Sequence, residues 1–478
     1  MKFVFSLRLW NVVLFTIIQA CVSTLIAIAV GMPAGWLTAK RKFFGRSLFT
    51  VITAVPFCMP PLLIALGVVM YYGMNGVINK LAAQFSLPAF KGLYSFWGIV
   101  FTHGFYNFPI IMRMCSDAWA KIPPEESDAA CLLGAGRFRI FRTITLYQLA
   151  PSLAASSILV FLYCFFSFII VLLLGGVGLS TIEVEVYQAV RASVDIAQAV
   201  RLAVLETAVA LGAVFLYSKL EQKAARNREV SFSARVDAKP VTGEAGKMLT
   251  AVFVLFILVF FAGPLLTILY KSFGSYSVLL RRRNFAKSVV STVTVGICTA
   301  CCCVVAGTFY AFFVHRQDVD KKNYFLRLLF PMLPVAVSPV VAGICVILVF
   351  GQGNVVSLVV VQTLLFWPFA YKQIISALDK IPLQVEESAR LLSVHSADVV
   401  AHIYLPVCGR AFFSAFAFCF AMSAGDTTIP LVLSIPNFET LSLFTYRLAG
   451  AYRFNEACAA GMVLALLSAG VFVLGKKK

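Results

Sequence analysis

Charged residues are scarce in this chain of 478 residues. They account for 13% of the sequence, whereas hydrophobic residues account for 60%, and the mean hydropathy is +0.90. Soluble globular domains carry about 25% charged residues, so this composition excludes a protein whose main solvent is water. We therefore expect a membrane protein.

A phosphate-binding loop is also absent. The nearest stretch, Gly243 to Met248, has neither the spacing nor the hydroxyl of the Gly-x4-Gly-Lys-Ser/Thr pattern. The chain is therefore expected not to be an enzyme, and any ATP would be bound by a separate partner. Cys/His pairs at zinc-binding spacing are lacking too. Most cysteines lie in apolar stretches and are expected to pack as small hydrophobic residues, so we expect no metal and no cofactor.

Apolar stretches recur along the whole length. Each has about 20 residues, enough to cross a hydrocarbon core of roughly 30 Å. The alternating pattern of a membrane β-barrel is absent, so these stretches can span only as helices that bond their own backbone. We expect an all-α polytopic protein with about eleven spans, over 11–38, 48–71, 96–117, 150–174, 202–219, 249–270, 289–314, 325–350, 355–376, 411–433 and 457–475.

The net charge of +19 does not indicate nucleic acid, because the basic residues are spread over short loops. Five basic groups fall in alternate loops, which the positive-inside rule assigns to the cytoplasm. This places the N-terminus outside and the C-terminus inside, and only Arg281 to Arg283 disagree. The five groups lie within 40–46, 137–142, 223–228, 316–327 and 476–478.

The sequence contains an internal duplication. Ile122-Pro123 recurs 259 residues later as Ile381-Pro382, and Phe108-Pro109 recurs as Trp367-Pro368 at the same offset. A fixed offset indicates tandem repeats. We expect a first half over 1–220 with about five spans, a cytoplasmic linker over 221–248, and a second half over 249–478 with six spans.

The first half lacks a counterpart to the opening span of the second half. Leu280 to Thr294 is similar to Phe3 to Ile17, so the missing span would precede that stretch. Either the first half evolved without it, or the true start lies upstream of Met1, which we favour.

Each copy of the duplicated segment, over 121–147 and 380–406, has the pattern of two short helices joined by a turn in a cytoplasmic loop. Small residues at its start would let a helix press closely into a groove on a partner, and an acidic group could pair with basic partner residues. The pattern consists of Asp128, Ala129, Ala130, Gly134, Ile144 and Leu146 in the first copy, and of Glu387, Ser388, Ala389, Ser393, Ile403, Leu405 and Pro406 in the second.

This pattern resembles the EAA loop of binding-protein-dependent ABC importer permeases: Glu-Ala-Ala, three residues, Gly, nine residues, Ile-x-Leu-Pro. The resemblance implies that both loops are coupling helices that rest on an ATP-binding subunit. Asp128, Tyr147, Ser388 and Ser393 depart from the family pattern, and Ser393 puts in doubt a left-handed turn at its position.

A wider resemblance, to bacterial thiamine importer permeases of the fused iron(III)/thiamine type, covers nearly the whole chain. It rests on residues in three stretches, which lie within Ser167 to Ala189, Ser423 to Arg453 and His103 to Pro109. It implies type I ABC importer transmembrane domains in the inner membrane that carry thiamine or a thiamine phosphate inward by alternating access. It also implies two copies of an ATP-binding cassette ATPase and a periplasmic or lipid-anchored substrate-binding protein as partners. Iron(III) or another small solute stays open as the cargo.

Asp426 lies within an apolar span, where a carboxylate costs roughly 2.5–3.5 kcal/mol on insertion scales. We expect it, with Gly425 and Ser167, to border the substrate pathway and to offset the desolvation of a cationic cargo. A cap on a broken helix is the alternative role for Asp426. Glu206 also lies within a span and is expected to pair with Arg201.

Glu183, Tyr187, Tyr452 and Arg453 are expected in outer loops, at the mouth or at the docking surface for the binding protein. Solvated loop residues without such a role are an equal alternative. An ion-gradient-driven secondary transporter is the rival class, but it predicts several intramembrane carboxylates that form an ion site, and here Asp426 is the main one.

Overall fold

The computed structural model describes residues 7–54, 59–176, 178–192, 195–230, 238–241, 243–315, 327–392 and 396–476. Helices form nearly all of the regular structure in these ranges, which confirms the all-α class. One short strand pair occurs among them, in which Arg41–Lys42 (β1) lies parallel to Lys239–Pro240 (β2). The chain divides into two compact units, Met1–Phe57 with Ile64–Ile268 and Cys58–Leu63 with Leu269–Lys478.

Nine helices in the described ranges are long and apolar enough to cross a membrane, and two helices that meet at 72° would make a tenth span. The remaining expected span, 96–117, is the helix α5 (Phe96–Trp119), which is not among the nine. Its polar side chains His103 and Asn107 are buried, and such groups are tolerated where protein surrounds them. The nine are Arg8–Lys40, Pro61–Gln84, Arg137–Phe165, Ile196–Glu221, Glu244–Ser272, Arg283–His315, Val355–Leu378, Val400–Gly425 and Phe454–Val471; the bent pair is Arg327–Ala336 with Pro339–Phe350.

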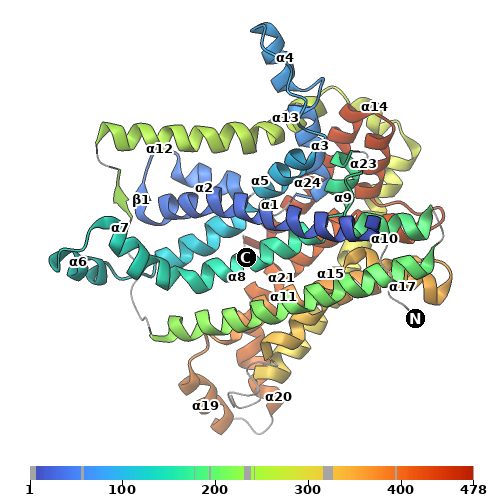
Figure 1. Ribbon diagram of the computed structural model, residues 1–478. Coiled ribbons are helices and arrows are strands. Elements are labelled where there is room, and N and C mark those ends of the chain that lie inside the picture. The colour runs from blue at the N-terminus through green and yellow to red at the C-terminus, as the bar shows by residue number, and fades with distance from the viewer. Residues whose placement is uncertain are drawn as a thin grey trace. The chain divides into compact units, whose positions relative to one another are not determined.

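In the first unit, α1 (Leu7–Lys40) packs along α5, and both pack against α8 (Leu146–Phe165) (Figure 1). The close approach requires glycine, because a Cβ atom at Gly31 would lie 2.7 Å from the carbonyl oxygen of Phe108. Other helices here are α2 (Arg46–Ala54), α3 (Pro61–Tyr72), α4 (Val77–Gln84), α6 (Pro124–Leu132), α7 (Arg137–Ile140), α9 (Ile169–Leu174), α10 (Ile182–Arg191) and α11 (Ile196–Val230).

The span over Glu244–Ser272 belongs to the first unit as far as Ile268, although its sequence opens the expected second half. It consists of α12 (Glu244–Ile257), a π-helical segment (Leu258–Ala262) and α13 (Gly263–Ser272). The hydroxyl of Tyr72 donates to the carbonyl oxygen of Phe260 at 3.2 Å, and the ring of Phe108 lies 5.1 Å from that of Phe261. The expected division at 221–248 describes the duplication and stays a prediction.

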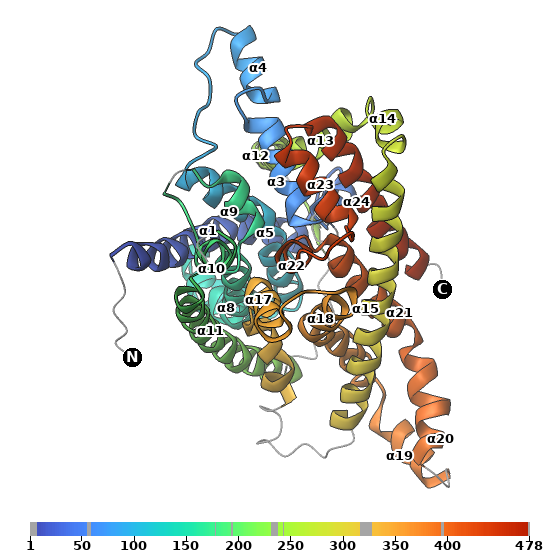
Figure 2. The same cartoon turned by 90° about the vertical axis from the view of Figure 1, so that its right-hand side faces the viewer.

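In the second unit, α15 (Arg283–His315), α18 (Val355–Leu378) and α21 (Leu405–Gly425) pack against one another (Figure 2). Gly307 permits this as Gly31 does in the first unit, since a Cβ atom there would lie 2.8 Å from the backbone nitrogen of Tyr371. The other elements are α14 (Tyr276–Leu280), a 3-10 helix (Phe330–Ala336), α17 (Pro339–Phe350), α19 (Leu383–Leu392), α20 (Ser396–Val399), a π-helical segment (Val400–Tyr404), α22 (Thr428–Leu433), α23 (Leu441–Gly450) and α24 (Phe454–Lys476).

Helices α5 and α18 illustrate how the duplicated sequence fixes local structure. Both have 24 residues, and their N-termini are capped by Ser95 and Asn354, which are 259 residues apart. Each cap side chain accepts a hydrogen bond from a backbone amide of the first turn, which satisfies a group that the helix itself cannot pair.

Candidate functional site

The first duplicated loop folds as α6, a tight turn and α7. Asp128 and Ala129 are exposed on α6, and Ala130 is half-buried. Gly134 ends the helix with φ +83°, in the left-handed region that favours glycine. The amides of Gly134 and Ala135 donate to the carbonyl oxygens of Cys131 and Ala130, both at 2.9 Å, which closes the turn.

The second loop folds alike over α19. Glu387 and Ser388 are exposed and Ala389 is half-buried, whereas Ser393 lies outside the described residues. A pair of leucines ends each of the two helices, the pairs being 259 residues apart, and all four side chains are almost fully exposed. They are Leu132 (90%), Leu133 (89%), Leu391 (88%) and Leu392 (87%).

A π-helical segment lies near the end of each loop, Phe141–Thr145 in the first and Val400–Tyr404 in the second. Ile144 and Ile403 lie within these segments. Leu146 and Leu405 are the first residues of α8 and α21, and Pro406 is the second residue of α21. The hydropathy pattern does not predict such a segment, because a single π-helical turn takes up one extra residue without a distinct pattern of apolar residues.

The two loops are tied differently to the helices that follow them. In the first, Gln148 on α8 donates a hydrogen bond to Glu126 on α6. In the second, the buried hydroxyl of Tyr404 donates to Glu386 on α19, and His315 at the end of α15 lies 3.3 Å from the same carboxyl group. The second loop is therefore held from two sides.

Ser167 and Asp426 occupy equivalent positions, 259 residues apart, each next to a break between a long helix and a short one. In the first unit, Nε2 of His103 lies 2.6 Å from Oγ of Ser167. In the second, Nε2 of Gln362 donates to Oδ2 of Asp426 at 2.9 Å. His103 and Gln362 are also 259 residues apart, so each break carries one polar clamp from α5 or α18.

Asp426 additionally caps α22. Its Oδ1 accepts hydrogen bonds from the amides of Thr428 at 2.9 Å and Ile429 at 3.3 Å. Its backbone carbonyl oxygen accepts from the hydroxyl of Ser442 at 2.7 Å. The neighbouring Gly425 is buried, and a Cβ atom there would lie 3.2 Å from the ring of Pro60. The geometry therefore gives Asp426 the capping role that the sequence left as an alternative.

The expected outer-loop residues differ in their environment. Tyr452 is 84% exposed and Arg453 is exposed, both in the turn between α23 and α24. Glu183 and Tyr187 lie on the short helix α10, in the connection between the spans that end at Phe165 and begin at Ile196. Glu183 is completely buried, and the ring of Tyr187 lies 5.1 Å from that of Phe168.

The expected pair of Glu206 and Arg201 does not form. Nε of Arg201 donates to the carbonyl oxygen of Ala197, one turn earlier on α11. Glu206 is completely buried, and neither of its carboxyl oxygens has a hydrogen-bond partner among the described residues.

Residues 31–226 match the family of binding-protein-dependent transport system inner membrane components. That stretch includes the first duplicated loop with its π-helical segment and the His103–Ser167 clamp. Permeases of this family are not enzymes and hold no cofactor, since a separate subunit hydrolyses ATP.

Full-length relatives agree with that match. The chain is 26% identical over 484 residues to the thiamine transport system permease protein of Brucella abortus (strain 2308), which covers 99% of this chain and 88% of the relative. It is 24% identical over 479 residues to the protein of that name from Escherichia coli (strain K12), covering 98% and 89%. A sulfate transport system permease protein of Salmonella typhimurium is 29% identical over 146 residues, 30% of this chain.

These similarities extend over the helices, the loops and the clamps described above. The chain is therefore a multi-pass membrane protein that is similar, along nearly its whole length, to the binding-protein-dependent transport system inner membrane components, which work with a separate ATPase and a substrate-binding protein.

Proposed function

We propose that this permease carries thiamine, or a thiamine phosphate, inward by alternating access, driven by two copies of an ATP-binding subunit. The substrate assignment is supported by relatives named as thiamine permeases that match along 97–99% of this chain. Iron(III) or another small solute is the alternative cargo. The similarity to permeases that depend on a binding protein and a separate ATPase argues against the ion-gradient-driven transporter.

The leucine pairs carry the coupling assignment. Apolar side chains that are about nine-tenths exposed, at the same place in two duplicated loops, lose contact with water only when a partner covers them. The exposed acidic and small residues Asp128, Ala129, Glu387 and Ser388 lie on the same two helices. Together they make two equivalent docking sites, one for each ATP-binding subunit.

The tethers and π-helical segments supply the transmission. Each docking helix is joined through a short helix and a π-helical segment to a spanning helix, α8 or α21. Movement of a docked subunit is thereby passed to the spanning helices, and we assign Gly134, Ser393, Ile144 and Ile403 to this connection. Ala130, Ala389, Leu146, Leu405 and Pro406 complete it.

The two helix breaks are the proposed border of the pathway. Discontinuous helices expose backbone polar groups at membrane depth, where transporters build their substrate sites. The clamps at Ser167 and Asp426, with Gly425 beside the second, hold these breaks open. We assign Tyr452 and Arg453, which are exposed, to contact with the substrate-binding protein; the buried Glu183 and the half-buried Tyr187 would act only by supporting the mouth.

Uptake of labelled thiamine tests this function. A host that lacks its own thiamine importer would express the chain together with an ATP-binding subunit and a binding protein. Both partners would come from the genome that encodes this chain. ATP-dependent uptake is expected for the wild type, and at least a tenfold loss for Leu132→Asp with Leu391→Asp, because a carboxylate on an apolar docking surface is desolvated without a partner.

The matched control is Phe85→Asp with Leu87→Asp, two exposed apolar residues (74% and 61%) outside the loops, which should leave uptake unchanged. Copurification of the ATP-binding subunit separates the two parts of the proposal. If the loop variant copurifies as much ATP-binding subunit as the wild type does, the assignment of the docking sites is contradicted. If the wild type assembles normally with its partners but takes up no thiamine, the substrate assignment is contradicted, and iron(III) is assayed next.

A further inference from the structure

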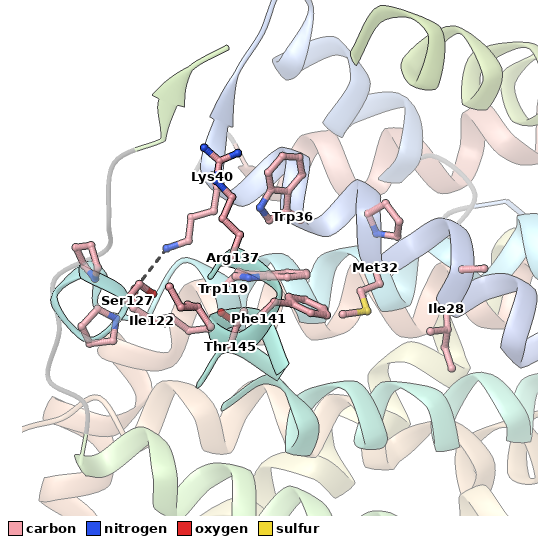
Figure 3. Close-up of a pocket in the computed structure, with 15 residues that line it drawn as sticks. Ile28, Met32, Trp36, Lys40, Trp119, Ile122, Ser127, Arg137, Phe141 and Thr145 are labelled. Atoms are coloured by element: carbon pink, nitrogen blue, oxygen red, sulfur yellow. Dashed lines mark hydrogen bonds between the residues drawn. The ribbon is translucent and has the colours of Figure 1, made fainter. Parts of the chain in front are cut away.

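The first unit contains a pocket of about 740 Å³ between the end of α1, the end of α5 and the first coupling-like loop (Figure 3). Its walls include Met32 and Trp36 on α1, Trp119 on α5, and Phe141 in the π-helical segment. The pocket thus joins a spanning helix to the loop that we propose as a docking site.

Comparison of the duplicated halves explains why this space is open. Ser127 and Thr145 line the pocket, and the residues 259 positions later are Glu386 and Tyr404. In the second unit the ring of Tyr404 is 1% exposed, and its hydroxyl donates to Glu386. Two small side chains in the first unit therefore stand where a large buried pair supports the loop in the second.

The lining favours a ligand with an anionic end and an apolar end. Lys40 and Arg137 are the charged residues among the fifteen that line the pocket, and none of the fifteen is acidic. Figure 3 shows Lys40 and Arg137 at one end, beside Trp36 and Trp119, and Ile28 at the other, with Met32 between. Arg41 adds positive charge nearby, with its guanidinium carbon 5.5 Å from the centre of the Trp36 ring.

The position along α1 identifies the ligand further. Lys40 is the last residue of this spanning helix, at the end that the positive-inside rule assigns to the cytoplasm, and Ile28 lies about three turns deeper in the span. Basic pockets between membrane helices on the cytoplasmic side attract anionic lipid headgroups. A free phosphate would leave the apolar end of the pocket unfilled.

We propose that this pocket binds one anionic phospholipid of the cytoplasmic leaflet, with its phosphate at Lys40 and Arg137 and an acyl chain along Met32 and Ile28. In the first loop the lipid takes the supporting place that the side chains of Glu386 and Tyr404 fill in the second loop.

Retention of phosphatidylglycerol by the purified full chain tests the proposal. The chain in phosphatidylcholine nanodiscs with a minor fraction of phosphatidylglycerol would be analysed by native mass spectrometry for bound lipid. Wild type should retain one phosphatidylglycerol. Lys40→Gln with Arg137→Gln should bind it about 30-fold more weakly, from the usual contribution of two cations near a membrane surface. Arg139→Gln with Arg142→Gln removes two exposed charges of the same loop that do not line the pocket, and should bind as wild type does.

Met32→Trp keeps both cations but fills the apolar part, so it should also release the lipid, and an excess of inorganic phosphate should not displace lipid from the wild type. Monodisperse elution establishes that each variant is folded. Unchanged retention by either the Lys40/Arg137 variant or Met32→Trp would overturn the site, and displacement by inorganic phosphate would overturn the lipid as its ligand.

Discussion

Asp426 makes three hydrogen bonds through its carboxylate, and all three hold a helix break together. We expect Asp426→Asn to keep the cap on α22 and to retain thiamine uptake within about threefold. Asp426→Ala loses both the cap and the partner of Gln362, so it should destabilise the chain by roughly 1–3 kcal/mol. Thermal melting in detergent, measured beside uptake, checks both variants.

The opposite result has a clear meaning. If Asp426→Asn melted like the wild type and yet lost uptake, the negative charge itself would act on the cargo. The clamp in the first unit provides a comparison, because Ser167 holds the equivalent break without a charge.

Several of these residues could be found from the sequence, and others could not. Asp426 stands out because a carboxylate is rare in an apolar span. Its partner Gln362 was missed, although aligning the halves at 259 residues sets it against His103. The pair of Glu206 and Arg201 failed because spacing on a helix does not reveal that an arginine bonds its own backbone.

Among the secondary-structure elements, the two π-helical segments show most clearly that the halves share one local structure. In the first, the hydroxyl of Thr143 donates to the carbonyl oxygen of Arg139 at 2.7 Å. In the second, Nδ1 of His402 lies 3.0 Å from the carbonyl oxygen of Asp398. His402 follows Thr143 by 259 residues, and Asp398 follows Arg139 by the same number. In both segments, therefore, a side chain bonds the backbone carbonyl group four residues earlier at the same position of the repeat.

Deleting Thr143 should convert the first π-helical segment to regular α-helix. Loss of one residue rotates α7 and the docking helix α6 by about 100° relative to α8, so we expect at least a tenfold loss of ATP-dependent uptake with normal membrane insertion. Thr143→Ala is the control, since it removes the hydroxyl but not the residue. Full uptake by the deletion variant would show that the segment does not set the orientation of the docking helix.

The loops themselves were predictable because their Pro, acidic and small residues recur at one offset. The pocket beside the first loop was not, since it depends on Ser127 and Thr145 being smaller than their counterparts. Only a comparison of the halves by side-chain volume would have found it.

At the scale of the whole chain, the first unit is completed by a segment from beyond the linker. The rings of Phe105 and Phe108 lie 6.1 Å and 5.1 Å from those of Phe260 and Phe261. Hydropathy predicts that 249–270 is a span, but it does not say which helices that span packs against.

A fragment of residues 1–274 should therefore persist longer in the membrane than a fragment of residues 1–243. Aromatic pairs contribute roughly 0.5–1.5 kcal/mol beyond their buried area, and the shorter fragment loses several. Pulse-chase labelling would give the two half-lives. The longer fragment with Phe260→Ala and Phe261→Ala is the matched control, and equal half-lives for 1–243 and 1–274 would contradict the packing.

The exposed leucine pairs also bear on how much of this permease a cell can keep. In the proposed assembly, Leu132, Leu133, Leu391 and Leu392 stay exposed until ATP-binding subunits cover them, and exposed apolar groups of this kind are recognised by chaperones and proteases on unassembled subunits. The supply of partner would then set the lifetime of the permease, and surplus copies would be removed from the membrane.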